Sequence, residues 1–158
     1  MDGLLVVGQG EVAAALEQIA GTLGWPVTVV DTLEETESAL PRCGTVVVTS
    51  HHEGVDGPAI AAALAHGVRY VGAMGSRATQ ARRREWMLAN GVADEELARL
   101  RAPVGLDIGA DSPGEIAVAV VAEIIALRRR GVSGGSLSER SGPIHPDLPP
   151  GSAVCPAG

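Results

Sequence analysis

The sequence predicts an α/β protein, a three-layer Rossmann-like fold with a mainly parallel sheet. Short, continuous apolar runs at residues 4–8, 27–31 and 45–50 are typical of strands that are buried on both faces of a parallel sheet. Segments with helical periodicity separate these runs, at 11–23 and 33–40, so the predicted order is βαβαβ. Hydrophobic residues make up 46% of the chain with no Phe and one Tyr, which favours an aliphatic core between helices and strands.

The same alternation continues beyond residue 50. Helices are predicted at 58–66 and 77–90, with a fourth strand at 68–73 and a short helical piece around 94–100. The last helix begins at a capping motif in which Ser112 is the N-cap, Pro113 the first helical residue and Glu115 the third residue after the cap. The expected inward-facing stripes are Val12, Leu16, Ile19 and Leu23 in the first helix and Ile116, Val120, Ile124 and Leu127 in the last.

A length of 158 residues suits one compact domain. We expect this domain to span residues 1–131. Residues 132–158 are rich in Gly, Pro and Ser and poor in periodic apolar residues, so they are predicted to form a C-terminal tail without a core of its own.

Charge and cysteine content narrow the function. A formal net charge of −7 argues against nucleic-acid binding, which needs a broad basic surface. Cys43 and Cys155 match neither a metal spacing nor a disulfide framework, and Cys43 is expected to pack at the edge of a strand. Because the chain also lacks 18 uninterrupted apolar residues and a leader pattern, we expect a cytoplasmic protein without a membrane segment.

The first βα turn, "GQGEVA" (8–13), has the Gly-x-Gly-x-x-Ala pattern. Gly8 permits a tight turn, Gly10 lets the backbone approach a phosphate, and Ala13 permits close packing of helix on sheet. Asp31 ends the second strand, where a carboxylate can accept hydrogen bonds from a ribose. Glu11 opposes this interpretation, because a carboxylate in the first helical turn repels a phosphate. The pattern favours a nucleotide-type site over a purely structural turn.

Two loops after later strands carry further candidates at the same sheet edge. In "SHHEGVD" (50–56), adjacent histidines with Glu53 and Asp56 lack a defined metal spacing, so ligand hydrogen bonding through His51 is favoured over a metal site. In "GAMGSR" (72–77), Gly75 and Ser76 begin a helix, and Arg77 in its first turn has the wrong sign for the helix dipole, which a bound anion would relieve. We expect Arg82, Arg83 and Arg84 to be solvated or to face a partner, with Trp86 and Met87 packing inward.

The segments "YVGAMGSRATQARRREWMLANGV" (70–92) and "LRAPVGLDIGADSPGEIAVAVVAEIIALRRRG" (100–131) together resemble the C-terminal Rossmann domain of the XdhC/CoxI family. The glycine turn and "SHHEGVD" occur in the expected order, and the resemblance covers about residues 3–131. It implies an accessory protein that binds molybdenum cofactor (molybdopterin), protects it, assists its sulfuration and passes it to the apoenzyme of a molybdenum hydroxylase such as xanthine dehydrogenase or carbon monoxide dehydrogenase. The positions that match family motifs are Gly8, Gly10, Asp31, His51, Asp56, Gly75, Ser76, Arg77, Gly105, Asp107 and Glu115.

Two departures from the family pattern bear on function. The family's first turn usually reads Gly-x-Gly-His, and Glu11 stands here in place of the histidine. The chain begins at the first Rossmann strand, so we expect the family's N-terminal domain to be supplied by a separate chain; a homo-oligomer is also compatible with the pattern.

Two other functions remain open from the sequence. An NAD(P)-binding oxidoreductase would use the glycine turn and Asp31 directly, but the sequence shows neither a substrate domain nor an evident pair of a general acid and a general base. A structural protein that has lost its ligand is the third interpretation. We therefore expect a cofactor-binding maturation factor rather than a catalyst.

Overall fold

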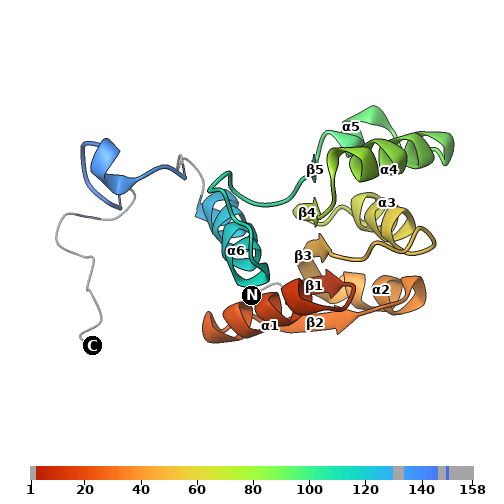
Figure 1. Cartoon of the computed structure of the whole chain (residues 1–158), viewed down its shortest axis with the longest axis horizontal. Helices are drawn as coiled ribbons and strands as arrows, with labels where there is room; N and C mark the ends of the chain where they lie inside the picture. Colours follow the sequence, from red (N-terminus) through yellow and green to blue (C-terminus); the bar gives the residue numbers. More distant parts are fainter. Residues whose placement is uncertain (1–2, 130–133, 146–148, 150–158) are drawn as a thin grey trace.

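The computed structural model describes residues 3–129, 134–145 and 149, and it confirms the predicted fold class. Five parallel strands form one sheet in the order β2-β1-β3-β4-β5 (Figure 1). The strand order reverses between β1 and β3, which is the point at which open α/β sheets bind ligands. The strands are β1 (Gly3–Val7), β2 (Val27–Val30), β3 (Cys43–Val48), β4 (Tyr70–Ala73) and β5 (Leu100–Arg101).

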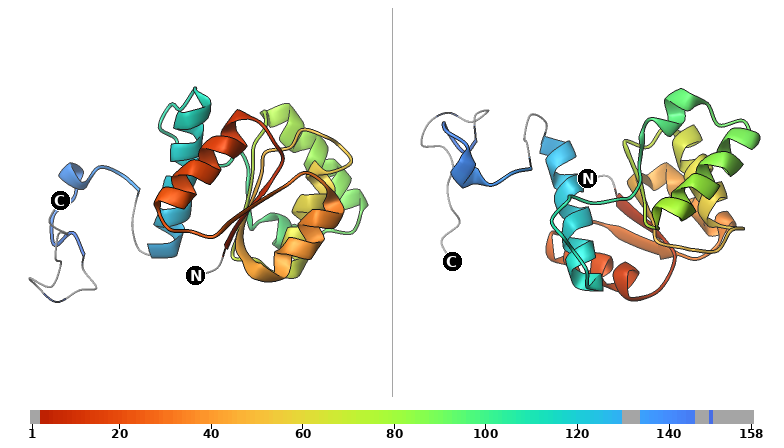
Figure 2. Two further views of the ribbon diagram at one scale, coloured as in Figure 1. Left: turned by 90° about the horizontal axis from the view of Figure 1, so that it is seen from below. Right: turned by 45° about the horizontal axis from the view of Figure 1, so that its top comes forward.

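Helices cover both faces of the sheet (Figures 1 and 2). On one face α1 packs against α6 and on the other α2, α3 and α4 lie in sequence, which gives the three predicted layers. The helices are α1 (Glu11–Thr22), α2 (Leu33–Ala39), α3 (Asp56–His66), α4 (Arg77–Ala89), α5 (Asp94–Leu97) and α6 (Pro113–Arg129), with short 3-10 turns η1 (Leu40–Arg42) and η2 (Leu137–Glu139).

The alternation of side chains along each strand divides the core in two. In β1, Leu5 and Val7 face the α2 and α3 side, whereas Leu4 and Val6 face α1 and α6, and all four are fully buried. Each such side chain contributes roughly 1.5–3 kcal/mol through burial. Cys43 is buried at the start of β3, as predicted.

Both ends of α6 follow the sequence prediction. The Ser112 Oγ accepts from the Glu115 N–H at 3.3 Å, and the Glu115 carboxylate accepts from the Ser112 N–H at 3.0 Å, so the capping box is confirmed. The backbone donors of Asp111 and Ser112 hold the pKa of Glu115 below its usual value. Arg128 and Arg129 lie in the last turn, where their positive charges interact favourably with the negative end of the helix dipole.

Three expectations were wrong in detail. The strand β5 was missed, because two residues leave no periodic signal. Leu23 and Leu127, both predicted to face inward, are 43% and 42% exposed. The buried positions of α1 are Ala13, Leu16 and Ala20, so Leu16 faces inward as predicted, and the two alanines let the helix lie close to α6. Within the described residues, no helix combines the length and apolar character needed to cross a membrane.

Candidate functional site

The carboxyl ends of the strands bring the predicted residues to one edge of the sheet. Because all five strands are parallel, the loops follow the strand order: Asp31 after β2, the glycine turn after β1, His51 after β3 and Arg77 after β4. Adjacent strands lie about 4.8 Å apart, so the ends of β2 and β4 are separated by roughly 14 Å. A single phosphate cannot contact both ends, whereas a ligand of nucleotide size can span them.

Arg83 is the functional feature that sequence reasoning missed. It was expected to be solvated, yet it is 0% exposed. Its Nε donates to Asp56 Oδ2 at 2.7 Å, its Nη2 donates to the Ser50 carbonyl at 3.0 Å, and its Nη1 donates to the Met74 carbonyl. A signal was available in the sequence, since Arg83 lies four residues before the buried Met87 and therefore on the same helix face.

Asp56 is the carboxylate that makes this burial possible. Besides Arg83, its Oδ2 accepts from Arg82 Nη2 at 2.7 Å, and its Oδ1 accepts from the Gly57 N–H at 2.6 Å. Burial alone would raise the pKa of Asp56, but the hydrogen bonds from Arg83, Gly57 and Arg82 together lower it below its usual value. The carboxylate is therefore charged at neutral pH and holds the beginning of α3 against α4.

Arg83 and Asp56 together fix the loops that carry two predicted site residues. Ser50 immediately precedes His51, and Met74 immediately precedes the Gly75 turn. Gln80 adds to this connection because its Nε2 donates to the carbonyls of Ala73 and Gly75, both at 3.3 Å. The edge formed by the ends of β3 and β4 is thus preorganised by buried polar contacts rather than by loop packing alone.

The N-terminus of α4 has the geometry expected of an anion site. Ser76 caps the helix, with its Oγ accepting from the Thr79 N–H at 3.2 Å, and Gly75 turns the chain with a φ of 136°. Arg77 is exposed in the first turn. In the described part of the chain, each of the other five α-helices has an acidic residue in its first turn, and α4 has none.

The two glycines of the first βα turn, Gly8 and Gly10, differ in their surroundings. A Cβ on Gly8 would lie 2.5 Å from both the Ser50 N and the Thr49 Oγ1, so glycine is required there by the close approach of β3. A Cβ on Gly10 would meet nothing within 4 Å, and Gly10 is the N-cap of α1 with no side-chain cap of its own. The turn therefore leaves backbone accessible at Gly10, while Glu11 is exposed in the first turn.

The remaining predicted residues lie around this edge with different surroundings. His51 and Asp107 are exposed, and Asp31 is exposed beyond β2. Gly105 approaches α6 closely, and its N–H donates to Glu123 Oε2 at 3.1 Å. In the described part of the chain, no group of three or more His, Cys, Asp or Glu side chains is placed to hold a metal ion.

Two hollows lie at the opposite, amino edge of the sheet. The larger, of about 670 Å³, is lined by residues from the end of α1, the starts of β3 and β4 and the end of α6, including Trp25, Thr45, Arg69, Ile125 and Arg129. The smaller, of about 240 Å³, shares Gly44 and Arg69 with it. Neither hollow is lined by the candidate cofactor-binding residues, so the two hollows are described separately from the carboxyl edge.

Known proteins resemble this chain over most of its length. It is 30% identical over 149 residues to a probable xanthine dehydrogenase subunit of Bacillus subtilis (strain 168), covering 80% of this chain and 43% of that protein. It is 29% identical over 126 residues to the molybdenum cofactor insertion chaperone PaoD of Escherichia coli (strain K12), covering 79% and 40%. An uncharacterized protein of Escherichia coli (strain K12), YqeB, is 28% identical over 166 residues, covering 90% and 30%.

A solved structure shares the fold. The crystal structure of a xanthine dehydrogenase from Bacillus halodurans matches with a TM-score of 0.67 at 24% identity, covering 86% of this chain and 45% of that one. The chain thus spans less than half of the length of each of these proteins. The family model described as the XdhC Rossmann domain matches residues 4–124. This chain therefore belongs to the XdhC Rossmann domain family, as the resemblance in its sequence implied.

Proposed function

We propose that this protein binds molybdenum cofactor, or its nucleotide portion, and serves the maturation of a xanthine dehydrogenase or carbon monoxide dehydrogenase type enzyme. Membership of the XdhC family supports a maturation role, as do two relatives, one named a cofactor insertion chaperone and the other a xanthine dehydrogenase component. The apoenzyme of a molybdenum hydroxylase is the expected partner.

The start of α4 is the single observation that carries the choice of site. A helix N-terminus presents N–H groups without intrahelical partners and a partial positive charge, which most helices offset with their own acidic side chain. Here the first turn holds Arg77 and no carboxylate, at the carboxyl end of β4. The arrangement concentrates positive potential where open α/β folds bind ligands.

The residues present fit the anionic part of molybdenum cofactor. That cofactor ends in a phosphate, or in a pyrophosphate in its dinucleotide forms, and the start of α4 supplies backbone donors plus a guanidinium that can bind phosphate bidentately. Gly75 turns the chain at a positive φ where a Cβ would crowd Thr79 and Arg83, and Arg83 fixes the position of the turn through the Met74 carbonyl. The molybdenum-bearing end of the cofactor would supply the redox centre to the client enzyme, and this chain would bind and orient the other end.

The test is cofactor binding by an Arg77→Ala variant. Losing a charge-assisted contact costs about 1.5–3 kcal/mol, so the Kd for molybdenum cofactor should rise roughly 10- to 100-fold. Titration calorimetry at low and at high ionic strength measures this, with inorganic pyrophosphate as a competing ligand. The loss should persist at high ionic strength, because a direct contact is screened less than a long-range attraction.

Arg84→Ala is the matched control. Arg84 lies on the same helix and is exposed. Its Nη2 lies 3.2 Å from Asp94 Oδ1, and this pair is away from the candidate site. The Arg84→Ala variant should bind molybdenum cofactor more weakly than the wild type only at low salt. Equal, salt-dependent losses in both variants would mean that α4 carries a diffuse basic surface and would contradict the site.

An NAD(P)-binding oxidoreductase is the second candidate, because one observation favours it. Gly10 caps α1 with open space beside its Cα, so a pyrophosphate can approach this backbone, and Asp31 lies at the end of the neighbouring strand. Glu11 in the same turn opposes an anion. Tight NAD(P) binding by the unmodified protein would favour this candidate over a maturation factor.

A further inference from the structure

The larger hollow at the amino edge lies far from the proposed cofactor site. β3 runs from Cys43 at this edge to Val48 at the other, a distance of about 17 Å at 3.3 Å per residue. Small-molecule ligands of open α/β folds bind at the carboxyl edge, so the fold gives no reason for a cofactor here. The hollow, called the amino-edge groove below, therefore needs its own explanation.

Three apolar side chains lie open in this groove, and the sequence predicted two of them, Leu23 and Leu127, to be covered. Leu23 at the end of α1, Ile125 and Leu127 on α6 are 43%, 37% and 42% exposed, and all three line the groove. Leu23 and Leu127 continue the inward stripes of their helices by spacing. Their helices end at the groove, and the described residues provide no element that covers them. Exposed apolar groups gathered around a hollow are typical of a protein-interaction site.

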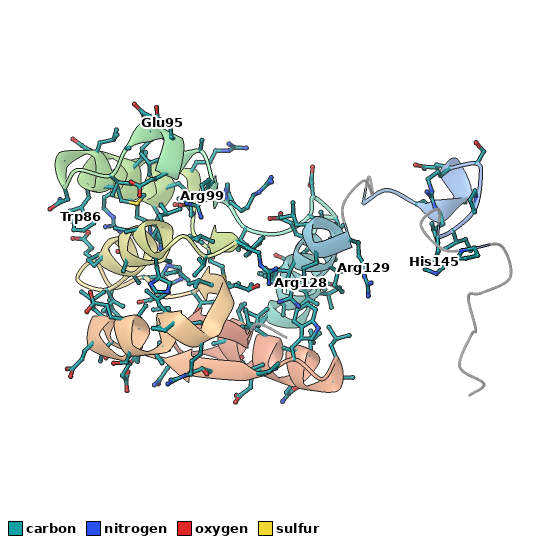
Figure 3. The ribbon with its side chains drawn as sticks, turned by 180° about the vertical axis from the view of Figure 1, so that it is seen from behind. Trp86, Glu95, Arg99, Arg128, Arg129 and His145 are labelled. Atoms are coloured by element: carbon teal, nitrogen blue, oxygen red, sulfur yellow. The ribbon has the colours of Figure 1, made fainter. Side chains whose placement is uncertain are left out.

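The charge of the groove is opposite to that of the chain. Three of the twelve basic residues, Arg69, Arg128 and Arg129, line it, and none of its described lining residues is Asp or Glu although the chain has nineteen. The smaller hollow beside it adds Arg42 and His66. Figure 3 shows Arg128 and Arg129 at the end of α6, across the sheet from Trp86 on α4.

Arg128 is held in place within the groove by two contacts. The Arg128 guanidinium lies 4.1 Å from the centroid of the Trp25 ring and donates to Thr45 Oγ1 at 3.1 Å. Burial and the neighbouring charge of Arg69 lower the pKa of Arg128, so two like charges are gathered beside an apolar floor. An acidic group on a partner would be attracted to this positively charged surface.

We propose that the amino-edge groove docks a segment of a different protein that combines apolar side chains with carboxylates. Leu23, Ile125 and Leu127 would cover its apolar side chains, and Arg129 would pair with its acidic group. A second copy of this chain fits less well, because a two-fold contact through this groove would set arginines against arginines. The proposal does not depend on cofactor binding at the carboxyl edge.

Photo-crosslinking in the source cells provides the first test. A benzoylphenylalanine at Ile125 should crosslink to one acidic protein segment, identified by mass spectrometry of the crosslinked peptide. Benzoylphenylalanine at Leu88, a position on α4 that is 43% exposed, is the control and should not crosslink to that segment. Crosslinks from Ile125 to residues 130–158 of the same chain, to a second copy, or to no protein would overturn the proposal.

Affinity measurements with the identified segment, made as a synthetic peptide, provide the second test. Arg129→Glu should weaken binding at least tenfold, whereas Arg84→Glu on α4 should leave it unchanged. Replacing the segment's contacting carboxylate by lysine should restore binding to the Arg129→Glu variant. Thermal unfolding confirms that the variants fold, and wild-type affinity in Arg129→Glu would overturn the proposal. Neither of these tests uses the cofactor. A negative result here therefore does not affect the proposed cofactor site, which the Arg77→Ala experiment tests separately.

Discussion

Arg83 links two loops and the start of α3 through one buried side chain. Its planar guanidinium offers donors in fixed directions, and these reach the ends of β3 and β4 and the carboxylate at the start of α3. Lysine carries its three donors on a single nitrogen, so it could not reach acceptors that are spread around the guanidinium plane. The sequence shows a cluster of arginines here. The helix pattern alone does not reveal that Asp56, 27 residues earlier, neutralises the inward-facing Arg83.

Replacing Arg83 by Gln should destabilise the fold by roughly 3–5 kcal/mol, because it leaves Asp56 buried with less of its compensating charge. Urea unfolding monitored by circular dichroism measures the change. Arg84→Gln, an exposed neighbour, should fall within about 0.5 kcal/mol of the wild type. Adding Asp56→Asn to the Arg83→Gln variant should recover part of the loss, since the uncompensated carboxylate is removed.

The Arg83–Asp56 pair should make the stability that the Arg83→Gln variant loses depend on pH. The folded pKa of Asp56 is lowered in the wild type, so its contribution is present above the usual value of about 4 and is lost as pH falls through the folded pKa. Without Arg83 the folded pKa rises, and the stability difference between the two proteins should shrink as pH falls from about 7 toward about 4. A difference that stays constant over this range would mean that the loss comes from packing and not from charge.

At the scale of elements, capping residues and periodicity together predict the helix bounds well and the edge strand of the sheet poorly. The bounds expected for α2 and α4, 33–40 and 77–90, lie within one residue of the observed ones, because capping residues mark their starts. β5 escapes prediction because its two residues form a strand only through pairing with β4. Leu23 and Leu127 follow the apolar period of their helices, yet only the tertiary arrangement decides what covers them.

The beginning of α1 carries a prediction about nucleotides. Glu11 is exposed in the first turn, where its carboxylate offsets the positive end of the helix and opposes a bound phosphate. Replacing it by His should strengthen NAD(P) binding, and Glu11→Gln, which removes only the charge, should give about a two- to fivefold gain. Calorimetric titration of the three proteins measures this. Unchanged, weak binding in both variants would mean that the turn is structural, as Gly8 already is.

At the scale of the whole molecule, the parallel sheet separates two surfaces of different character. The carboxyl edge carries the candidate cofactor residues, which could be assigned to one edge from the sequence because every loop after a parallel strand meets there. The amino edge carries the groove, which the sequence did not reveal because its residues come from the ends of α1 and α6 and the starts of β3 and β4. Between them β3 is buried along nearly its whole length, so the two edges are joined by a rigid element.

This separation predicts that the two binding events are independent. Residues more than about 7–10 Å apart that share no partner usually have additive effects within about 0.5 kcal/mol, and the edges lie roughly 17 Å apart along β3. Arg77→Ala should therefore weaken cofactor binding alone, Arg129→Glu should weaken segment binding alone, and the double variant should show the sum of the two losses. Titrating each ligand in the absence and presence of the other measures the coupling directly. A coupling above about 1 kcal/mol would show instead that the sheet transmits a change between its edges, so that docking of the partner segment would itself control how firmly the cofactor is held.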